Sequence, residues 1–313
     1  MLNFLIRRLI SVLPVLAVVA VIVFAMLRMT PGDPAAVIAG DGASAQDIDQ
    51  MRAMLGLDKS LPAQFADWIW KVLQGDLGYS FFYKMQVSEL IAQRLGPTFS
   101  VAVVTIILTV IIAVPLGILA AWRRGSWLDQ SIMAISVAGL SIPVFVGGYV
   151  LIWLFSMQCG LLPSQGYAPF DRGITDWLLC LALPCLTLAM MYSALIARVT
   201  RAAVSEVLTE DFIRTVRAKG VGEFRLLIRH ALSNAAVPIV TVVGLSLAGL
   251  IGGVVVTETI FAIPGVGQLT VDAVLSRDYP LIQGITVFFS LVYVVINLLV
   301  DLSYLLLDPR IRY

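Results

Sequence analysis

The chain has 313 residues, of which 59% are hydrophobic and only 13% charged, with a formal net charge of +1. An average soluble domain carries about 25% charged residues, so this composition excludes an ordinary cytosolic enzyme and indicates a membrane protein with several spans. The near-neutral charge argues against nucleic acid binding, and a single His with three scattered Cys supports neither a zinc site nor a disulfide framework.

Six apolar runs are long enough to cross a bilayer core of about 30 Å, which takes roughly 20 residues of helix; the last is uncharged from Leu281 to Val300 and continues past Asp301 to Leu307. We expect an all-α integral membrane protein with six transmembrane helices. The predicted spans are 9–27, 95–122, 132–157, 177–197, 235–257 and 281–307. A cleaved signal peptide is the competing interpretation of residues 1–30, but the first apolar run is longer than the roughly 7–15 residues of such a peptide and no small-residue cleavage motif follows it.

Charge asymmetry predicts the orientation of these helices. With the N-terminus inside, the inner segments hold 13 basic and six acidic residues, whereas the short outer loops hold only Arg172 and Arg277 as basic residues. Because cytoplasmic loops are enriched in Lys and Arg, both termini are expected in the cytoplasm. Five of the six spans contain a proline, which either kinks the helix or opens a central pathway.

Residues 1–29 are thus expected to form the cytoplasmic N-terminus and first helix, 30–94 a helical periplasmic segment, and 95–313 the other five helices. A breaker cluster, Thr30–Pro34, ends the first span. Ser44 and Asp47 have the spacing of a capping box, and Phe65, Trp68, Ile69 and Val72 form one face of a second short helix. This segment either docks an external partner or packs on the outer face.

The loop 198–234 between the predicted fourth and fifth spans is the longest inner loop. Phe212, Ile213 and Val216 fall on one helical face, and Gly220 suits a helix C-terminus. A second amphipathic helix follows, with Phe224, Leu227, Ile228 and Ala231 as its expected apolar side. A basic helix–turn–helix of this kind fits a groove of another protein; an anionic membrane surface is the alternative, which the acidic residues of the loop weaken.

The run from Arg214 to Gly220 (RTVRAKG), with the run from Arg229 to Ala235 (RHALSNA) and Pro238, resembles the coupling loop of ABC importer permeases of the dipeptide/oligopeptide/nickel branch. It departs from the general form of that loop, since Arg214, Thr215 and Val216 stand where Glu-Ala-Ala is usual. Other segments typical of the branch occur in the same order along the chain: Leu5–Leu9, Thr30–Pro34, Leu55–Asp58, Gly75–Gly78, Thr257–Phe261, Pro264–Gly267, Arg277–Pro280 and Asp308–Tyr313.

The resemblance implies a permease subunit of an ATP-driven importer for peptides or similar small solutes, located in the bacterial inner membrane. It implies as partners a second homologous permease, two ATPase subunits that carry ATP and magnesium, and a periplasmic solute-binding protein. The sequence has no G-x-x-x-x-G-K-[ST] phosphate loop, so we expect no cofactor and no enzyme activity on this chain. The expected ATPase-coupling residues are Phe212, Ile213, Arg214, Thr215, Arg217, Ala218, Lys219, Gly220, Arg229 and His230.

A second set of residues concerns the membrane region. Gly249 and Gly253, with Gly252 beside them, have the small-xxx-small spacing of close helix contacts, either within the chain or with the second permease. We expect these glycines, together with Glu258, to lie near the translocation pathway or at the contact with the second permease. Glu258 and Asp301 are acidic residues at helix ends, with either a structural or a proton-coupling role. A stand-alone secondary transporter or channel is the alternative function; it predicts internal repeats, which we do not find, and leaves the long inner loop unexplained.

Overall fold

The computed structural model describes residues 2–29, 35–36, 42, 44–54 and 56–307, and within these ranges the chain is mostly helical. It divides into two compact units. The first contains the described parts of 1–96 together with 268–294, and the second contains 97–267 and the C-terminal part from residue 295. The predicted division at 94/95 follows membrane topology rather than compactness and stays a prediction.

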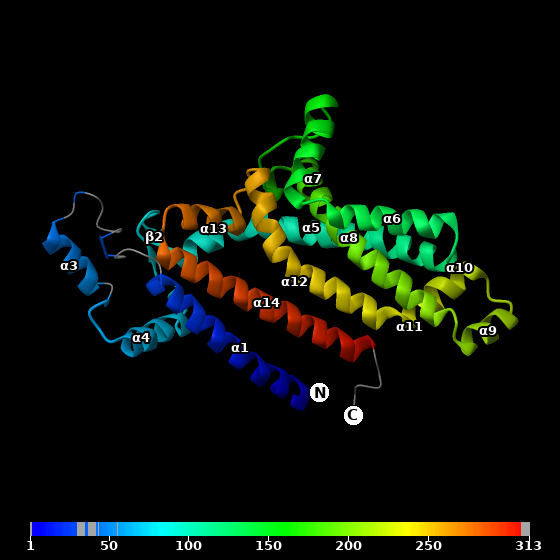
Figure 1. The fold of residues 1–313 in the computed structure, drawn as a ribbon, viewed down its shortest axis with the longest axis horizontal. Helices are drawn as coiled ribbons and strands as arrows, with labels where there is room; N and C mark the ends of the chain where they lie inside the picture. The colour runs from blue at the N-terminus through cyan, green and yellow to red at the C-terminus, as the bar shows by residue number, and fades with distance from the viewer. Residues whose placement is uncertain (1, 30–34, 37–41, 43, 55, 308–313) are drawn as a thin grey trace. The chain divides into compact units, whose positions relative to one another are not determined.

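In the first unit, α1 (Leu2–Met29) is followed by α3 (Ala45–Met54) and α4 (Leu61–Leu73) (Figure 1). The predicted capping box is confirmed: Asp47 N donates to Ser44 Oγ at 3.3 Å, and Ser44 N donates to the Asp47 carboxylate at 3.0 Å. The predicted apolar face of α4 is also confirmed, because Phe24 of α1 packs against Phe65 and Trp68 with ring centroids 5.1 and 6.0 Å apart. The breaker cluster Thr30–Pro34 lies outside the described residues.

The all-α prediction missed a short antiparallel hairpin of β1 (Tyr79–Ser80) and β2 (Met85–Gln86), in which Tyr79 pairs with Gln86. Two-residue strands are too short to show an alternating pattern. The buried Ser80 hydroxyl donates to the carboxylate of Asp278, which also accepts from the Leu281 backbone N–H at 3.3 Å at the start of α14 (Tyr279–Leu307). This polar contact ties the hairpin to the first turn of α14.

The second unit is built around α8 (Ile174–Val207) and α12 (Ala236–Ile260), which pack against each other. Their shared core includes the fully buried Leu181, Leu188 and Leu250. Glycines allow close helix approach: a Cβ at Gly117 of α5 (Val87–Trp122) would lie 2.6 Å from Thr200 Cβ of α8. Helix α5 begins at Val87, eight residues before the predicted second span.

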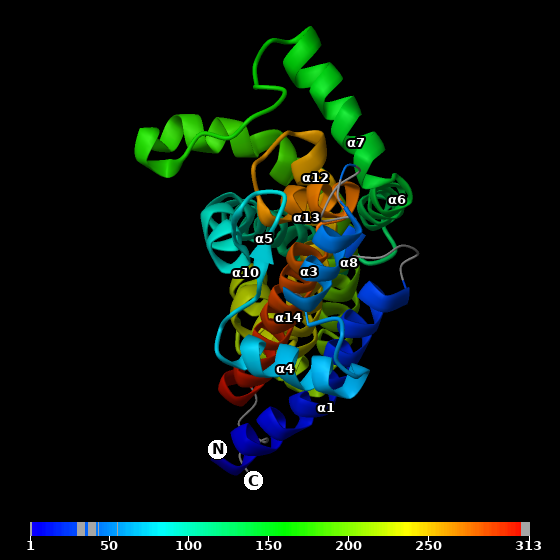
Figure 2. The ribbon, with the colours of Figure 1, turned by 90° about the vertical axis from the view of Figure 1, so that its left-hand side faces the viewer.

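The third predicted span, 132–157, is wrong as a single helix. The segment consists of α6 (Trp127–Ser141), α7 (Val144–Leu151) and the π-helix η1 (Ile152–Gln158), with a bend of 103° at the break (Figures 1 and 2). Ile142 is extended, with φ −84° and ψ 120°, because the ring of Pro143 disfavours a helical conformation in the preceding residue. A proline inside an apolar run here ends the helix rather than kinking it.

The remaining elements are the 3₁₀ turn η2 (Phe170–Arg172), the segment α9–α11 described below, and α13 (Val266–Leu275), which lies where the sequence predicted only a loop. Among the described residues, α5, α8, α12 and Tyr279–Tyr304 of α14 are long and apolar enough to cross a membrane, and the bent pair α6/α7–η1 makes a fifth span if it counts as one. The stretch Ile10–Met26 of α1 is a shorter apolar helix, so the count of six stays a prediction.

Candidate functional site

The loop between α8 and α12 forms the predicted helix–turn–helix. Helix α8 extends to Val207, ten residues past the predicted span, and carries Arg198 and Arg201 in its last three turns. After a turn come α9 (Asp211–Ala218), α10 (Glu223–Arg225), the π-helix η3 (Leu226–Ala231) and α11 (Leu232–Asn234), which leads directly into α12 (Figure 1). We call residues 208–235 the α9–α11 loop.

Gly220 adopts the left-handed conformation expected after a helix, with φ +78°. Its N–H donates to Arg217 O at 2.9 Å, and Lys219 N–H donates to Thr215 O at 3.1 Å, which closes the last turn of α9. No atom lies within 4 Å of the position where a Cβ would stand at Gly220. Glycine is therefore favoured here for its backbone conformation and not for space.

The apolar side of α9 divides between the interior and the surface. Ile213 is completely buried as α9 packs against η3, whereas Phe212 is 40% exposed. On the second arm the predicted apolar face is partly wrong: Leu226, Leu227 and Ala231 are buried, while Phe224 and Ile228 are 80% and 42% exposed. The cause is the π-helix at 226–231, whose wider winding shifts the face that a regular helix would bury.

The basic residues of the loop face solvent, and two of them form ion pairs within the loop. Arg214 lies 3.4 Å from Asp211, and both side chains are almost fully exposed. The Arg217 guanidinium donates two hydrogen bonds across the glycine turn to the Glu223 carboxylate, at 3.0 and 3.4 Å. Of the other predicted coupling residues, Thr215, Ala218, Lys219 and Arg229 are exposed and His230 is half-buried. Exposed Phe212, Phe224 and Ile228 thus share the α9–α11 loop with exposed basic groups.

A part-buried ion pair near the C-terminal end of α8 was not predicted from the sequence. The guanidinium of Arg201 donates to both carboxylate oxygens of Asp129 on α6, with Nη2 2.7 Å from Oδ2, and the Asp129 side chain is only 3% exposed. Asp129 also accepts from the Gly125 N–H at 3.0 Å. The only sequence signal was the position of Asp129, three residues after Ser126. The Ser126 hydroxyl caps α6 by accepting a hydrogen bond from the Asp129 N–H. The pair joins the short 123–126 turn to the helix that leads into the α9–α11 loop.

The glycines of α12 make contacts within the chain. A Cβ at Gly253 would lie 3.0 Å from Leu188 Cδ2, and one at Gly249 would lie 3.4 Å from the Tyr192 hydroxyl, so this pair packs against α8. Gly252 is exposed and has nothing within 4 Å of a Cβ. Of the two alternatives for the small-residue stripe, the internal contact accounts for Gly249 and Gly253.

Glu258, at the end of α12, is completely buried. Its Oε1 accepts from the Thr98 hydroxyl at 2.6 Å, and that hydroxyl in turn accepts from Val266 N–H at 2.8 Å. The carboxylate also lies against the backbone of Gly265 and Gly267, where a side chain would clash with it. These contacts hold the turn after α12 and favour a structural role for Glu258; Asp301 is half-buried on α14.

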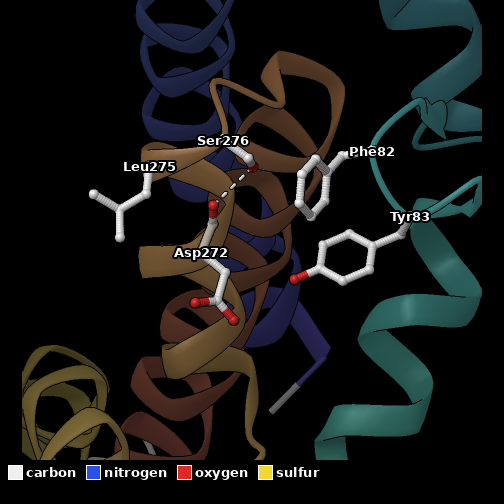
Figure 3. A pocket seen from close by; sticks show the side chains of 5 residues that line it. All are labelled: Phe82, Tyr83, Asp272, Leu275 and Ser276. Atoms are coloured by element: carbon white, nitrogen blue, oxygen red, sulfur yellow. Dashed lines mark hydrogen bonds between the residues drawn. The ribbon is translucent and has the colours of Figure 1, made fainter.

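A shallow hollow of about 360 Å³ lies in the first unit, between the hairpin loop and α13 (Figure 3). Phe82, Tyr83, Asp272, Leu275 and Ser276 line it. Burial and the neighbouring Asp272 raise the pKa of Tyr83 above its usual value. Within the described ranges no three His, Cys, Asp or Glu side chains lie close enough together to hold a metal ion.

Comparison with known proteins decides the family. Residues 113–313 match the binding-protein-dependent transport system inner membrane component family, and residues 1–102 match the N-terminal region of such membrane components. The chain belongs to this family. It is a permease subunit of an ABC importer and a multi-pass protein of the inner membrane, and its relatives are transport components rather than enzymes.

The permease is 51% identical, over 99% of both chains, to a probable peptide ABC transporter permease of Sinorhizobium fredii. It is 44% identical, over the whole of both chains, to the glutathione transport system permease of Escherichia coli. Among solved structures it resembles the methionine ABC transporter in inward-facing conformations, with a TM-score of 0.60, 19% identity and coverage of 70% of this chain and 96% of that one. The structural likeness shows a shared fold.

Proposed function

We propose that this permease is one of two homologous membrane subunits of an importer for peptides or similar small solutes, and that the pair is a heterodimer. A periplasmic binding protein delivers the solute, and two ATPase subunits, which hold ATP and magnesium, bind on the cytoplasmic side. The observation that carries the proposal is the exposed apolar and basic surface of the α9–α11 loop, on a chain whose relatives are named as peptide and glutathione permeases. Dipeptides, oligopeptides, glutathione, nickel chelates and sugars remain the candidate solutes.

The mechanism follows from the connections of the loop. Phe212, Phe224 and Ile228 present apolar surface to a groove of an ATPase subunit, with Arg214, Lys219 and Arg229 nearby to pair with its acidic groups. Closure of the ATPase dimer on ATP displaces α9. Because the α9–α11 loop is joined to α8 at one end and α12 at the other, the displacement reaches these two helices directly. The part-buried Arg201–Asp129 pair carries the displacement to α6 as well.

Co-purification and uptake test this function. The permease, expressed with its partner permease and ATPase subunits, should retain the ATPases in detergent, and proteoliposomes of the complex should take up solute only with ATP and the binding protein. A stand-alone secondary transporter would instead purify without ATPases and accumulate solute on a proton or sodium gradient. That outcome would overturn the proposal.

We also propose six membrane spans with both termini in the cytoplasm. Helix α1 supports the sixth span, because its 28 residues extend about 42 Å at about 1.5 Å per residue, more than the bilayer core. Single Cys residues at positions 45 and 126, in a background without native Cys, should react with impermeant reagents from the periplasmic and cytoplasmic sides respectively. Labelling of position 45 only from the cytoplasm would reverse the orientation.

Arg214 and Arg217 distinguish docking on protein from docking on lipid. If these arginines bind anionic lipid headgroups, lysine should replace them fully. The attraction then depends on charge alone and contributes about 1 kcal/mol for each basic residue. If they bond into a protein groove, the planar fork of arginine matters and lysine replaces it poorly. We expect Arg214→Lys to lower co-purification of the ATPase in detergent, where bilayer charge is absent.

Arg217 needs a control, because its guanidinium already pairs with Glu223 inside the loop. Glu223→Gln removes that partner and leaves Arg217 unchanged. We expect Arg217→Lys to lose more ATPase than Glu223→Gln. Equal losses would assign Arg217 to the internal pair, and full retention of the ATPase by both lysine variants would refute a geometric role for these arginines.

A further inference from the structure

Two arginines between two tryptophans form the short turn that joins α5 to α6. The turn runs from Trp122, the last residue of α5, through Arg123 and Arg124 to Trp127, the first residue of α6. We call residues 122–127 the α5–α6 turn. The predicted second span, which ends where the turn begins, contains no charged residue. The chain therefore changes from apolar to cationic at this point.

Both tryptophan side chains of the turn are exposed. Trp127 is 85% exposed, the highest value among the large hydrophobic side chains that the structure describes, and Trp122 is 39% exposed. A tryptophan at the end of a membrane span prefers the level of the lipid headgroups, because its ring is apolar while its N–H needs a polar partner. Two such residues on adjacent helix ends indicate that the α5–α6 turn lies at the surface of the bilayer.

The two arginines keep their charge available for a partner. The guanidinium carbon of Arg123 lies 4.4 Å from the centroid of the Trp122 ring, a cation–π contact that holds the charge beside the apolar ring. Arg124 is exposed, and within the described ranges neither arginine forms a salt bridge. The nearby carboxylate of Asp129 is already bonded by Arg201. The turn thus carries two positive charges that the chain itself does not neutralise.

The backbone of the turn is fixed by hydrogen bonds. Gly125 adopts φ +79°, and its N–H donates to the Asp129 carboxylate at 3.0 Å. The Ser126 N–H donates to Arg123 O at 3.0 Å. A charge pair on an ordered turn loses less conformational freedom on binding than a pair on a flexible one.

The length of α8 places the turn nearer the apolar spans than the α9–α11 loop. Arg201, which bonds Asp129 beside the turn, is followed by the rest of α8 up to Val207. These residues extend about 9 Å, at about 1.5 Å per residue, before the α9–α11 loop begins. A partner in the aqueous phase therefore reaches the α9–α11 loop first, whereas the α5–α6 turn is at the height of the headgroups.

We propose that the α5–α6 turn binds the phosphate of an anionic phospholipid. Arg123 and Arg124 donate to the phosphate oxygens, to which the guanidinium group is well matched, and the rings of Trp122 and Trp127 lie against the glycerol and the first acyl carbons. A zwitterionic headgroup would bring its own cation beside the arginines, so a lipid with a net negative charge fits better. The inference goes beyond the proposed function, because it concerns neither the solute nor the ATPase subunits.

Quenching of Trp127 fluorescence by brominated lipids tests the site. The assembled complex is titrated in detergent with brominated phosphatidylglycerol or, separately, with brominated phosphatidylcholine. The emission that Trp127→Phe removes gives the signal of Trp127. We expect half-quenching by phosphatidylglycerol at a concentration at least about 5-fold lower than by phosphatidylcholine, the factor expected for one basic residue at an anionic surface. Equal concentrations for the two lipids would overturn the proposal.

Double variants separate a binding role of the arginines from a general effect of charge. Arg123→Gln with Arg124→Gln should abolish the preference for phosphatidylglycerol, whereas lysine at both positions should retain most of it. The matched control, Arg225→Gln with Arg229→Gln, removes the same charge from exposed positions of the α9–α11 loop and should leave the preference unchanged. Retention of the preference by the first glutamine variant, or an equal loss in the control, would contradict the proposal.

Contact of the turn with an ATPase subunit is the competing interpretation, and co-purification distinguishes it. We expect the complex with Arg123→Gln and Arg124→Gln to retain its ATPase subunits in detergent without added lipid. Loss of the ATPase subunits by this variant, with the lipid preference intact, would assign the turn to the ATPase interface and overturn the proposal.

Discussion

Gly220→Leu is expected to abolish most solute-stimulated ATP hydrolysis and transport while the permease still inserts in the membrane. Leucine at φ +78° brings its Cβ too close to the following carbonyl oxygen, at a cost of about 1–2 kcal/mol. That free energy lowers the population of the native turn by about 5- to 30-fold. ATPase activity and uptake of the reconstituted complex, measured at equal permease content, give the effect.

The control for this change is Gly220→Asn, because asparagine adopts the left-handed conformation far more readily than leucine. The surroundings of Gly220 are open, so neither side chain meets a steric obstacle in the chain itself. We expect the asparagine variant to retain most activity. Normal transport by Gly220→Leu would remove this turn from the coupling mechanism, and equal loss in both variants would point to contact with the ATPase rather than to backbone strain.

Gly267→Ala is expected to destabilise the permease strongly. A Cβ at this position would lie 2.6 Å from Val255 Cα and 2.8 Å from Glu258 Oε2, so the turn after α12 would have to move away from the helix. Overpacking of this kind costs about 1–3 kcal/mol. Thermal unfolding in detergent, followed by tryptophan fluorescence, measures the change.

Gly252→Ala is the matched control, since it lies on α12 with nothing within 4 Å of its new methyl group. Alanine in a helix interior is favoured over glycine by about 1 kcal/mol, so this variant should be at least as stable as the wild type. A loss of stability in Gly252→Ala equal to that in Gly267→Ala would show that the close approach at Gly267 is not what limits the substitution.

Local patterns were reliable where their cause was local. The capping box at Ser44 and the left-handed Gly220 depend on neighbouring residues, and the apolar face of α4 depends on the spacing within one helix; all three predictions are confirmed. The apolar face of the second arm of the α9–α11 loop was partly wrong, because a π-helix changes the spacing on which such a prediction depends. The roles of the predicted coupling residues stay predictions.

The sequence by itself determined the class, the family resemblance and most of the helices, because a bilayer demands long apolar helices and an aqueous loop demands turns and charge. Only the tertiary structure decided how α6 and α7 bend at Pro143, that Asp129 pairs with Arg201, and that Glu258 is buried against Gly265 and Gly267. Whether a polar group is paired, buried or hydrogen-bonded depends on which residues a helix distant in the sequence places beside it. A pattern along the sequence does not contain that information.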